Sequence, residues 1–425
     1  MSRKVKKIIS VFLIVGVAAT SWVFGNSDKR SIEDIYYNQY REPIVRMLAY
    51  INQYYYGKDD VDYSKILDSL LKGMVDGIGD PFAWYFDARQ TTENHIDETG
   101  KYGGLGITVR YDSPTKSIVI VSPMYGTPAE KAGLMANDYI ISVDGSPVSE
   151  TGYMKAIDRM RGKPGTPVKI KVIREGWKKA KEIEIVRALI ETKTVKYTTF
   201  EKDSEKIGYI RLTNFGDKSD VEMNNALKDL STKNINGLIL DLRNNPGGLL
   251  HIAINIASMY IKNDVIVYLK YSDGSEETTT PIPGKYFDFL NGLPITVLVN
   301  KGSASASEIL TGALKDNKIA TIIGGTTYGK AAVQRPFTFP NGGEAWIPIG
   351  HYFTPNKIDI HLKGIEPNIK IDNPVKEVKS SIDIEKEKNE ALNQTTNKVY
   401  LNFKNDLQLN KAIEVILEKL GEKVN

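Results

Sequence analysis

Hydrophobic positions along the chain follow three patterns, and each pattern predicts a different kind of structure. Across residues 30–90 aliphatic residues recur at helical spacing, until glycine and proline at 77–81 end that pattern. From 102 to 187 short alternating segments separated by turn residues predict strands, with one short helix at 128–133. From 206 onward apolar strands alternate with helices, which is typical of an α/β core.

The individual elements of the second and third regions can be predicted from the same periodicities. In the second region we expect strands at 117–122, 139–143 and 168–174. In the third we expect strands at 207–212, 237–242, 295–300 and 320–324, and helices at 221–230, 252–260 and 305–315. A charged, polar stretch at 375–398 predicts a linker, and the apolar stripe of 405–420 predicts a final amphipathic helix.

The first 25 residues combine positive charge with apolar character. Arg3, Lys4, Lys6 and Lys7 precede an uncharged run over 8–25, which is the pattern of an export signal. A buried core helix is the alternative, although core helices rarely lie at the extreme terminus behind four cations. Because no clean small-residue cleavage site follows, we expect an uncleaved anchor with the rest of the chain outside. Cleavage would instead give a secreted protein.

Composition narrows the classes of function. The chain has 425 residues, 41% hydrophobic and 25% charged, so two or three globular domains are expected. It contains no cysteine, which excludes disulfides, thiolate catalysis and cysteine-ligated metal sites. The formal net charge is +4, and the N-terminal cations account for all of it, so no basic domain remains to bind nucleic acid.

Residues 302–308, Gly-Ser-Ala-Ser-Ala-Ser-Glu, follow an apolar strand and open a helix. One interpretation is structural: Ser305 caps the helix and Glu308 reaches back to it, as in a capping box. The other is catalytic. A serine at this position exposes its hydroxyl beside free backbone N–H groups and the positive end of the helix dipole, which suits a developing oxyanion.

A nucleophilic serine requires a general base, and Lys330 is our candidate. It follows a glycine and has apolar neighbours, and burial would disfavour its charged form. On a strand, Lys330, Ala332 and Gln334 would face one side, so that the Gln334 amide orients the amine. The alternative is that Lys330 is a solvated surface group, as most lysines are. None of the histidines lies in a tight motif with a carboxylate; they are His95, His251, His351 and His361. A triad based on His251 stays open as an alternative.

Residues 241–248, Asp-Leu-Arg-Asn-Asn-Pro-Gly-Gly, end a predicted buried strand in a turn with an unobstructed backbone. An oxyanion hole needs two backbone N–H donors. We expect one from Ala306, directly after the candidate nucleophile, and the other from Gly248 or Gly247. A tight turn without further role is the alternative for the glycine pair.

These three motifs, in this order, resemble those of the carboxyl-terminal processing peptidases, also called tail-specific proteases. The resemblance implies that Ser305 is the nucleophile, Lys330 the base and Gln334 its partner. It places the oxyanion glycine at Gly248, with Gly247 as the adjacent alternative.

The same resemblance implies the fold, an α/β (α+β) multidomain protein with a mixed-sheet, ClpP/crotonase-like core. Two positions depart from the family pattern. Ala331 stands where glycine is usual, and adds a methyl beside the base; Gly325 stands where glutamate is frequent. We expect the alanine to be tolerated, because the three side chains that carry the chemistry are intact.

A glycine-rich loop precedes the first strand of the second region, which resembles a PDZ domain, a β-rich and partly open barrel with short helices. In such a domain loop N–H groups hold a terminal carboxylate while the peptide adds a strand, so protein tails with apolar C-termini are the implied ligands. An ordinary hairpin turn is the alternative. Arg161 matches a motif thought to couple PDZ position to the active site in relatives, but a turn-stabilising role fits it equally. The loop residues are Tyr102, Gly103, Gly104, Leu105 and Gly106.

The expected function is a serine endopeptidase that cleaves proteins near their C-termini through an acyl-enzyme, without metal or cofactor. An inactive membrane-anchored PDZ scaffold and a hydrolase using His251 are the alternatives. Flanking helices make dimers in relatives, so we expect a homodimer, on the extracytoplasmic side of the bacterial cell envelope. The expected organisation is an anchor over 1–25, a helical region over 26–90, a PDZ domain over 91–187, a Ser/Lys peptidase core over 188–373, and a linker with a C-terminal helix over 374–425.

Overall fold

The computed structural model describes residues 36–99, 101–124, 126–191, 193–372, 401, 403 and 406–424. The chain divides into two compact units, residues 1–69 and 70–425. The anchor predicted over 1–25 and the linker predicted over 375–398 lie outside the described residues. Within the described part, no helix combines the length and the apolar character needed to span a bilayer.

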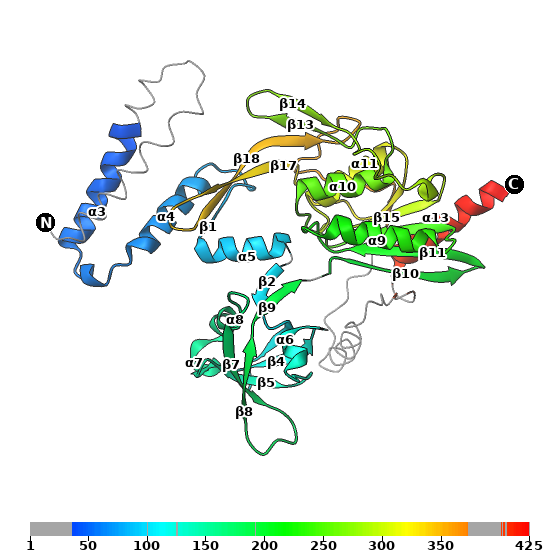
Figure 1. Cartoon of the computed structure of the whole chain (residues 1–425). Helices are drawn as coiled ribbons and strands as arrows, with labels where there is room; N and C mark the ends of the chain where they lie inside the picture. Colours follow the sequence, from blue (N-terminus) through cyan, green and yellow to red (C-terminus); the bar gives the residue numbers. More distant parts are fainter. Residues whose placement is uncertain are drawn as a thin grey trace. The chain divides into compact units, whose positions relative to one another are not determined.

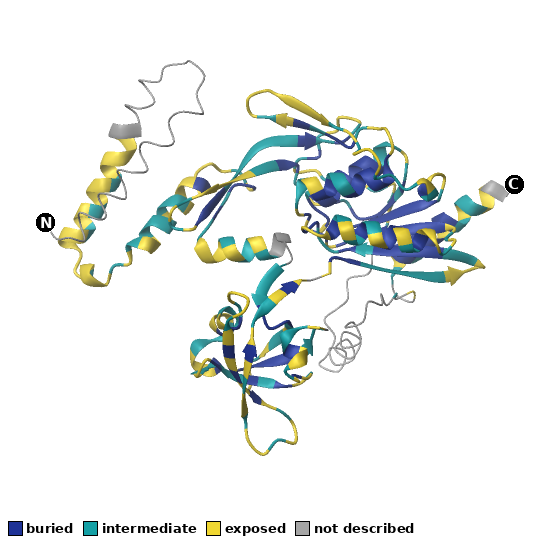
Figure 2. Cartoon of the chain, in the orientation of Figure 1, coloured by how far each residue is buried: buried dark blue, intermediate teal, exposed yellow. Residues whose placement is uncertain are grey.

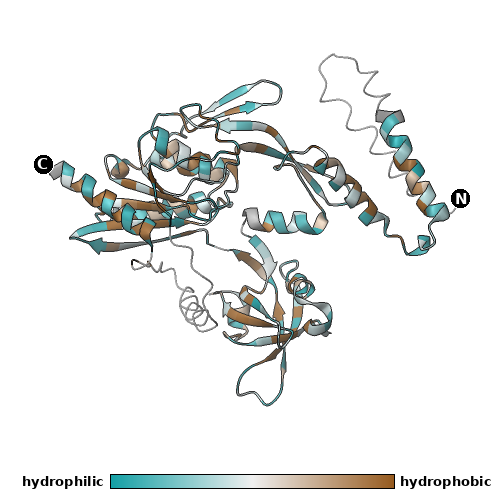
Figure 3. Ribbon diagram, turned by 180° about the vertical axis from the view of Figure 1, so that it is seen from behind, coloured by the Kyte–Doolittle hydropathy of each residue, from teal (hydrophilic) through white to brown (hydrophobic). Residues whose placement is uncertain are grey.

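From residue 36 onward the first unit is helical, as its sequence pattern predicts. It contains a π-helical turn at Tyr36–Arg41, helix α3 over Glu42–Tyr54 and a 3-10 turn at Lys58–Asp60, and helix α4 (Tyr63–Asp76) begins in it. A proline in the first turn of α3 suits its start, because proline lacks an N–H that would have no partner there. No residue of α3 is buried. Both α3 and α4 carry hydrophobic and hydrophilic residues (Figure 3).

A six-stranded sheet forms the centre of the α/β core in the second unit (Figure 1). Strands β10 and β11 pair antiparallel, and each later pair of neighbours is parallel. The two central strands, β12 and β15, are buried at every residue (Figure 2), because helices cover both faces of the sheet. In spatial order the strands are β10 (Val195–Lys202), β11 (Glu205–Leu212), β12 (Gly237–Asp241), β15 (Ile295–Val299), β16 (Thr321–Gly324) and β19 (Ile369–Lys370).

Successive side chains of the central strands point to opposite faces of this sheet. The face that includes Leu238 packs against α9, α10 and α11, whereas the face that includes Ile239 packs against α13. The strands and helices predicted for the core, and the final amphipathic helix, are confirmed. The helices are α9 (Ser219–Ser231), α10 (Leu250–Tyr260), the 3-10 turn η3 (Asp288–Leu290), α11 (Ala306–Asp316) and α13 (Leu407–Val424).

A five-stranded antiparallel sheet carries the segment that follows Lys330. A β-bulge interrupts the pairing of β17 with β18 between Val333 and Gln334. Strand β1 falls within the region 26–90 that was predicted to be helical; its three residues are aromatic, and aromatic residues favour strands. The strands are β1 (Trp84–Phe86), β13 (Val267–Tyr271), β14 (Glu276–Thr279), β17 (Ala332–Thr338) and β18 (Glu344–Phe353).

The residues between α5 (Ala88–Thr99) and the core form a β-rich domain with its own hydrophobic core, in which Ile118, Ile140 and Ile170 are fully buried. Its sheet has the order β3-β4-β5-β7-β8, with β6 paired to β5, so β3 lies at an edge. The predicted strands of this region and its short helix are confirmed, and so is the mixed α/β fold class. The elements are β2 (Lys101–Gly104), β3 (Ile107–Asp112), β4 (Ser117–Pro123), α6 (Pro128–Lys131), β5 (Tyr139–Val143), β6 (Ser146–Pro147), α7 (Val148–Thr151), α8 (Tyr153–Met160), β7 (Pro167–Ile173), β8 (Lys181–Val186) and β9 (Ala188–Glu191).

Candidate active site

Ser305 lies at the N-cap of α11, with a backbone conformation that residues other than glycine rarely adopt (φ 54°, ψ −117°). Such a conformation costs about 1–3 kcal/mol and persists only where its surroundings enforce it. Two contacts do so. The Ser305 N–H donates to Oε2 of Glu308 at 2.9 Å, and the hydroxyl of Tyr352 donates to the Ser305 carbonyl at 3.1 Å. The carboxylate half of the expected capping box is therefore present.

The candidate oxyanion donors differ in whether their N–H groups are already used. The Gly247 N–H donates to Oδ1 of Asn245 at 2.9 Å. Within the described chain, neither the Gly248 N–H nor the Ala306 N–H donates a hydrogen bond. Of the two glycines, only Gly248 therefore has an N–H that can bind an oxyanion together with the N–H of Ala306.

Both positions of the glycine pair require glycine. Gly247 and Gly248 have φ of 103° and 140°, which side chains rarely permit. A Cβ on Gly247 would lie 2.8 Å from Cβ of Ser305, and one on Gly248 would lie 2.5 Å from the carbonyl oxygen of Phe215. The turn is thus packed directly against the candidate nucleophile.

Lys330 lies just before β17, not within it. The expectation that Lys330, Ala332 and Gln334 alternate along one strand is therefore wrong: the strand begins at Ala332 and is bulged before Gln334. The Lys330 Nζ lies 4.4 Å from the centroid of the Trp84 ring, a contact that stabilises an ammonium. The Gln334 Nε2 donates to the Phe82 carbonyl at 2.6 Å, which leaves its Oε1 as an acceptor.

Glu308 connects the segments that carry Ser305 and Lys330. Its side chain is fully buried and its carboxylate accepts four hydrogen bonds. Oε1 accepts from the hydroxyl of Thr327 at 2.5 Å and from the N–H of Gly329 at 2.7 Å. Oε2 accepts from the N–H groups of Ser305 and Lys330, each at 2.9 Å. Burial raises the pKa of Glu308 above its ordinary value, although these hydrogen bonds oppose the shift.

Tyr352 makes a second connection between the same segments. Its buried hydroxyl lies within hydrogen-bonding distance of the carbonyl oxygens of both Ser305 and Lys330. Burial, with a smaller contribution from Glu308, raises the pKa of Tyr352 well above its ordinary value, so the hydroxyl stays a donor. The sequence motifs did not indicate this role, because β18 lies outside all three of them.

The remaining expectations concern Ala331 and the histidines. Ala331 is fully buried and its methyl belongs to the main hydrophobic core. His251 is exposed and, among the described residues, its imidazole makes no hydrogen bond. The rings of His351 and His361 are stacked, with centroids 4.1 Å apart. No cluster of side chains that could hold a metal occurs in the described part of the chain.

The glycine-rich loop of the β-rich domain borders a groove of about 150 Å³. Gly103 does not line this groove. Its backbone packs against Gly162 instead, and a Cβ on Gly103 would lie 1.9 Å from the Gly162 carbonyl oxygen. Edge strand β3 and helix α8 form the apolar sides, and the Arg161 guanidinium lies 5.4 Å from the centroid of the Tyr102 ring. The lining residues are Tyr102, Gly104, Leu105, Gly106, Ile107, Val109, Tyr153, Ile157, Met160 and Arg161.

Both the α/β core and the β-rich domain are similar to known protein families. Residues 206–371 match peptidase family S41, and residues 95–173 match the PDZ domain. A carboxy-terminal-processing protease of Bartonella bacilliformis is 35% identical, over 84% of this chain and 83% of its own length. The carboxy-terminal processing protease CtpA of Bacillus subtilis is 34% identical, over 88% of this chain and 78% of its own.

A solved structure named as a photosystem II D1 C-terminal processing protease is 29% identical; the match covers 72% of this chain and 81% of that one, with a TM-score of 0.45. The level of identity to the curated relatives, and the share of each chain that it covers, decide the assignment. The chain belongs to peptidase family S41, as a serine-type peptidase of the C-terminal processing group that carries a PDZ domain.

Proposed function

We propose that Ser305 and Lys330 form the catalytic pair of this peptidase. The observation that carries the proposal is the unused pair of N–H donors, from Ala306 and Gly248, directly beside a serine held in a forced backbone conformation. Preorganised donors of this kind stabilise a tetrahedral oxyanion without reorganisation. Glu308 and Tyr352, by binding the backbone of both segments, support the proposal that the two side chains act together.

In the proposed reaction, neutral Lys330 takes the proton from the Ser305 hydroxyl as Oγ attacks the scissile carbonyl carbon. The oxyanion accepts hydrogen bonds from Ala306 and Gly248, and Lys330 then gives its proton to the leaving amine. Lys330 next deprotonates a water molecule, which hydrolyses the ester and frees Ser305. The Oε1 of Gln334, whose Nε2 is engaged by Phe82, would accept from the amine and orient it.

We propose that the PDZ groove selects protein tails with apolar C-termini. The apolar sides of the groove and the open edge of β3 support binding by strand addition. Arg161, which stacks on Tyr102 within the lining, is our candidate for coupling tail binding to the core.

We also propose attachment to the cytoplasmic membrane through residues 1–25, with the catalytic domains on the extracytoplasmic side of the cell envelope, and a homodimer. The basic and apolar N-terminal sequence supports the first proposal. Exposed apolar side chains on α3 and α4, among them Met47, Tyr50 and Met74, support the second.

The proposed catalytic pair is tested with Ser305→Ala and Lys330→Ala variants. The substrate is an unfolded protein that ends in an apolar tail. Each substitution should lower kcat by about 10³-fold or more, because members of a catalytic unit act together. Lys262→Ala is a matched control, since the Lys262 side chain is 64% exposed and its partner Asp288, at 3.4 Å, is exposed as well, so that little stability depends on the pair. Full activity in Lys330→Ala would refute the mechanism.

A further inference from the structure

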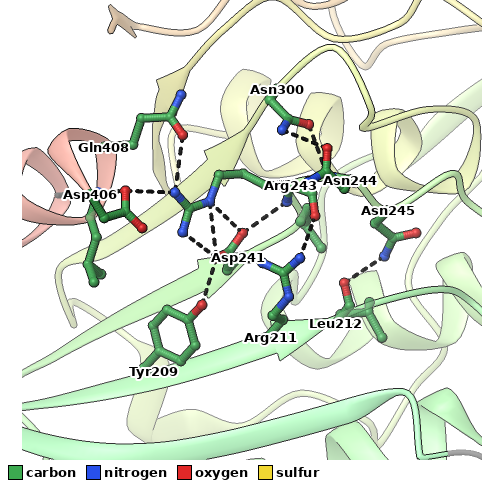
Figure 4. Close-up of polar contacts among 12 residues, drawn as sticks. Tyr209, Arg211, Leu212, Asp241, Arg243, Asn244, Asn245, Asn300, Asp406 and Gln408 are labelled. Carbon is green, nitrogen blue, oxygen red and sulfur yellow. Dashed lines mark hydrogen bonds and ion pairs between the residues drawn. The ribbon is translucent and has the colours of Figure 1, made fainter. Parts of the chain in front are cut away.

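The turn that carries Gly248 begins at a buried cluster of charged residues (Figure 4). Asp241, at the end of β12 and fully buried, accepts hydrogen bonds from Nε and Nη2 of Arg243 at 3.0 and 2.6 Å. It also accepts from Nη1 of Arg211 at 2.9 Å and from the Tyr209 hydroxyl at 2.6 Å. One carboxylate therefore faces two guanidinium groups, and a buried charge is costly unless it is paired.

The C-terminal helix supplies the second carboxylate. Nη1 of Arg243 donates to Oδ1 of Asp406 at 2.8 Å and to Oε1 of Gln408 at 3.2 Å, at the start of α13. Figure 4 shows Arg243 between Asp241 on one side and these two residues on the other. Asp241 and Asp406 together balance Arg211 and Arg243, so the cluster is neutral only when α13 is docked.

Both residues at the start of α13 are fixed by contacts of their own. The Asp406 carboxylate caps the helix by accepting the Leu409 N–H at 3.0 Å. Gln408 is buried, and its Nε2 donates to the Ile371 carbonyl at 2.8 Å. Behind them, the apolar side of α13, with Leu409 and Ile413, packs against the core sheet. The carboxylate and the amide are thus held rigidly toward Arg243.

On its other side, Arg243 is followed by residues that contact the segment over 300–307, which carries Ser305. The residues after Arg243 are held to that segment: Asn245 accepts from the Ala304 N–H at 3.0 Å and from the Ser307 hydroxyl at 2.8 Å. Asn244 and Asn300 exchange two hydrogen bonds of 2.9 Å each. A shift of Arg243 would therefore be transmitted to the turn that presents the Gly248 N–H.

We propose that Asp406 and Gln408 are positioning residues for the peptidase reaction: by fixing Arg243, the C-terminal helix sets the geometry of the oxyanion turn. The proposal rests on the proposed function. Neither residue contacts substrate; both act through Arg243 on the position of one N–H donor. Ground-state binding of substrate should not depend on them, whereas stabilisation of the oxyanion should.

The test uses the full chain with Asp406→Asn and Gln408→Met. Asparagine keeps the helix cap and the shape but removes the charge, and methionine removes the hydrogen bonds of the glutamine to Arg243 and to Ile371. Each substitution should lower kcat about tenfold to a hundredfold with KM unchanged, because small misplacements of a catalytic group have effects of this size. The affinity of a peptide aldehyde, whose adduct with Ser305 places an oxyanion in the hole, should fall by the same factor.

Three controls separate positioning from a general loss of stability. Glu414→Gln changes a carboxylate of the same helix that pairs with Lys411, and should leave both measurements unchanged. Asp406→Glu, which keeps the charge, should recover part of the lost kcat. The peptide amide of the same sequence should bind with equal affinity to Ser305→Ala alone and to Ser305→Ala combined with Asp406→Asn or Gln408→Met.

The inference is overturned if Asp406→Asn and Gln408→Met melt at lower temperature but keep the parental kcat and aldehyde affinity. It is also overturned if Glu414→Gln loses as much activity as they do. An inactive parent, or an active Ser305→Ala variant, would instead refute the proposed function and is recognisable as such.

Discussion

At the scale of single residues, Glu308 shows how one side chain serves both local structure and the candidate site. A glutamate at this position of a helix satisfies one N–H of the first turn. Here it accepts three further hydrogen bonds from Thr327, Gly329 and Lys330, which lie 19 to 22 residues further along the chain. The capping interaction expected from the sequence therefore also fixes the backbone of the candidate base.

Glu308→Gln should separate these contributions. An amide places an NH₂ group where the carboxylate accepts two donors, so two hydrogen bonds are lost in a buried site. We expect the free energy of unfolding to fall by about 1–3 kcal/mol and kcat to fall at least tenfold. Urea denaturation and peptide hydrolysis measure the two quantities.

Glu222→Gln is the matched control, because Glu222 accepts the N–H groups of Thr194 and Val195 away from the site. It should lose stability without loss of kcat. Equal kcat for parent and Glu308→Gln would show that Glu308 has a structural role only.

The motifs were sufficient to nominate Ser305 and Lys330 and, through the family resemblance, to prefer Gly248 to Gly247, but they did not give the physical reason for that preference. That choice depends on Asn245, whose side chain occupies one of the two N–H groups, and side-chain direction within a turn is not visible in a sequence pattern. Tyr352 was missed for a different reason. It reaches the site by strand pairing over a long sequence separation, without a local motif.

At the scale of secondary structure, the segment around Lys330 departed most from expectation. Its apolar neighbours suggested a strand, but Gly329 has φ 93° and the extended pairing starts only at Ala332. The core strands, by contrast, were predictable, because continuous apolar runs between helices are typical of buried parallel strands. Strand periodicity can predict a sheet but does not place a bulge.

The ring of His361, in the loop after β18, stacks on that of His351, and we expect His361 to make the stability of this region depend on pH. The pKa of His361 lies below its ordinary value, first because of burial and then because of His351 and Lys363, while Asp359 and Asp80 oppose the shift. Because the folded state favours neutral His361, its contribution to stability is present above the unfolded pKa of about 6.5 and is lost as pH falls through the folded value.

His361→Phe should keep the ring packing against Phe82 and remove this proton linkage. We expect the parent to lose more stability than the variant between pH 7.5 and 5, by no more than about 1.4 kcal/mol per pH unit. Chemical denaturation at both pH values measures the difference. Exposed His251→Gln is the control and should behave as the parent does; parallel pH profiles for parent and His361→Phe would contradict the assignment.

At the scale of the whole molecule, a PDZ groove and a peptidase core in one chain imply that binding and cleavage can be separated. The order of the two domains was predictable from the sequence, because each has its own pattern of strands and turns. The anchor over residues 1–25 and the homodimer stay predictions. The anchor concerns residues outside the described part of the chain, and the homodimer concerns a second copy of the chain.

Ile157→Lys should uncouple the two activities. It places an ammonium in the apolar groove, so KM for a protein with an apolar tail should rise at least tenfold, since a group that loses its hydration without a partner is costly. The kcat for a short peptide without such a tail should not change. Ile173→Lys, at a 41% exposed position of the same domain, is the matched control. An unchanged KM in Ile157→Lys, or indifference of the parent to amidation of the substrate tail, would argue against selection by the groove.

The backbone of Ser305 has a consequence for how this chain can change over time. Glycine adopts its φ and ψ freely, so a mutation to glycine there would relieve strain while removing the hydroxyl. Selection for a stable fold and selection for the hydroxyl therefore act in opposite directions at this one position. A lineage that no longer needed hydrolysis would be expected to lose this serine early, while the fold around it persisted.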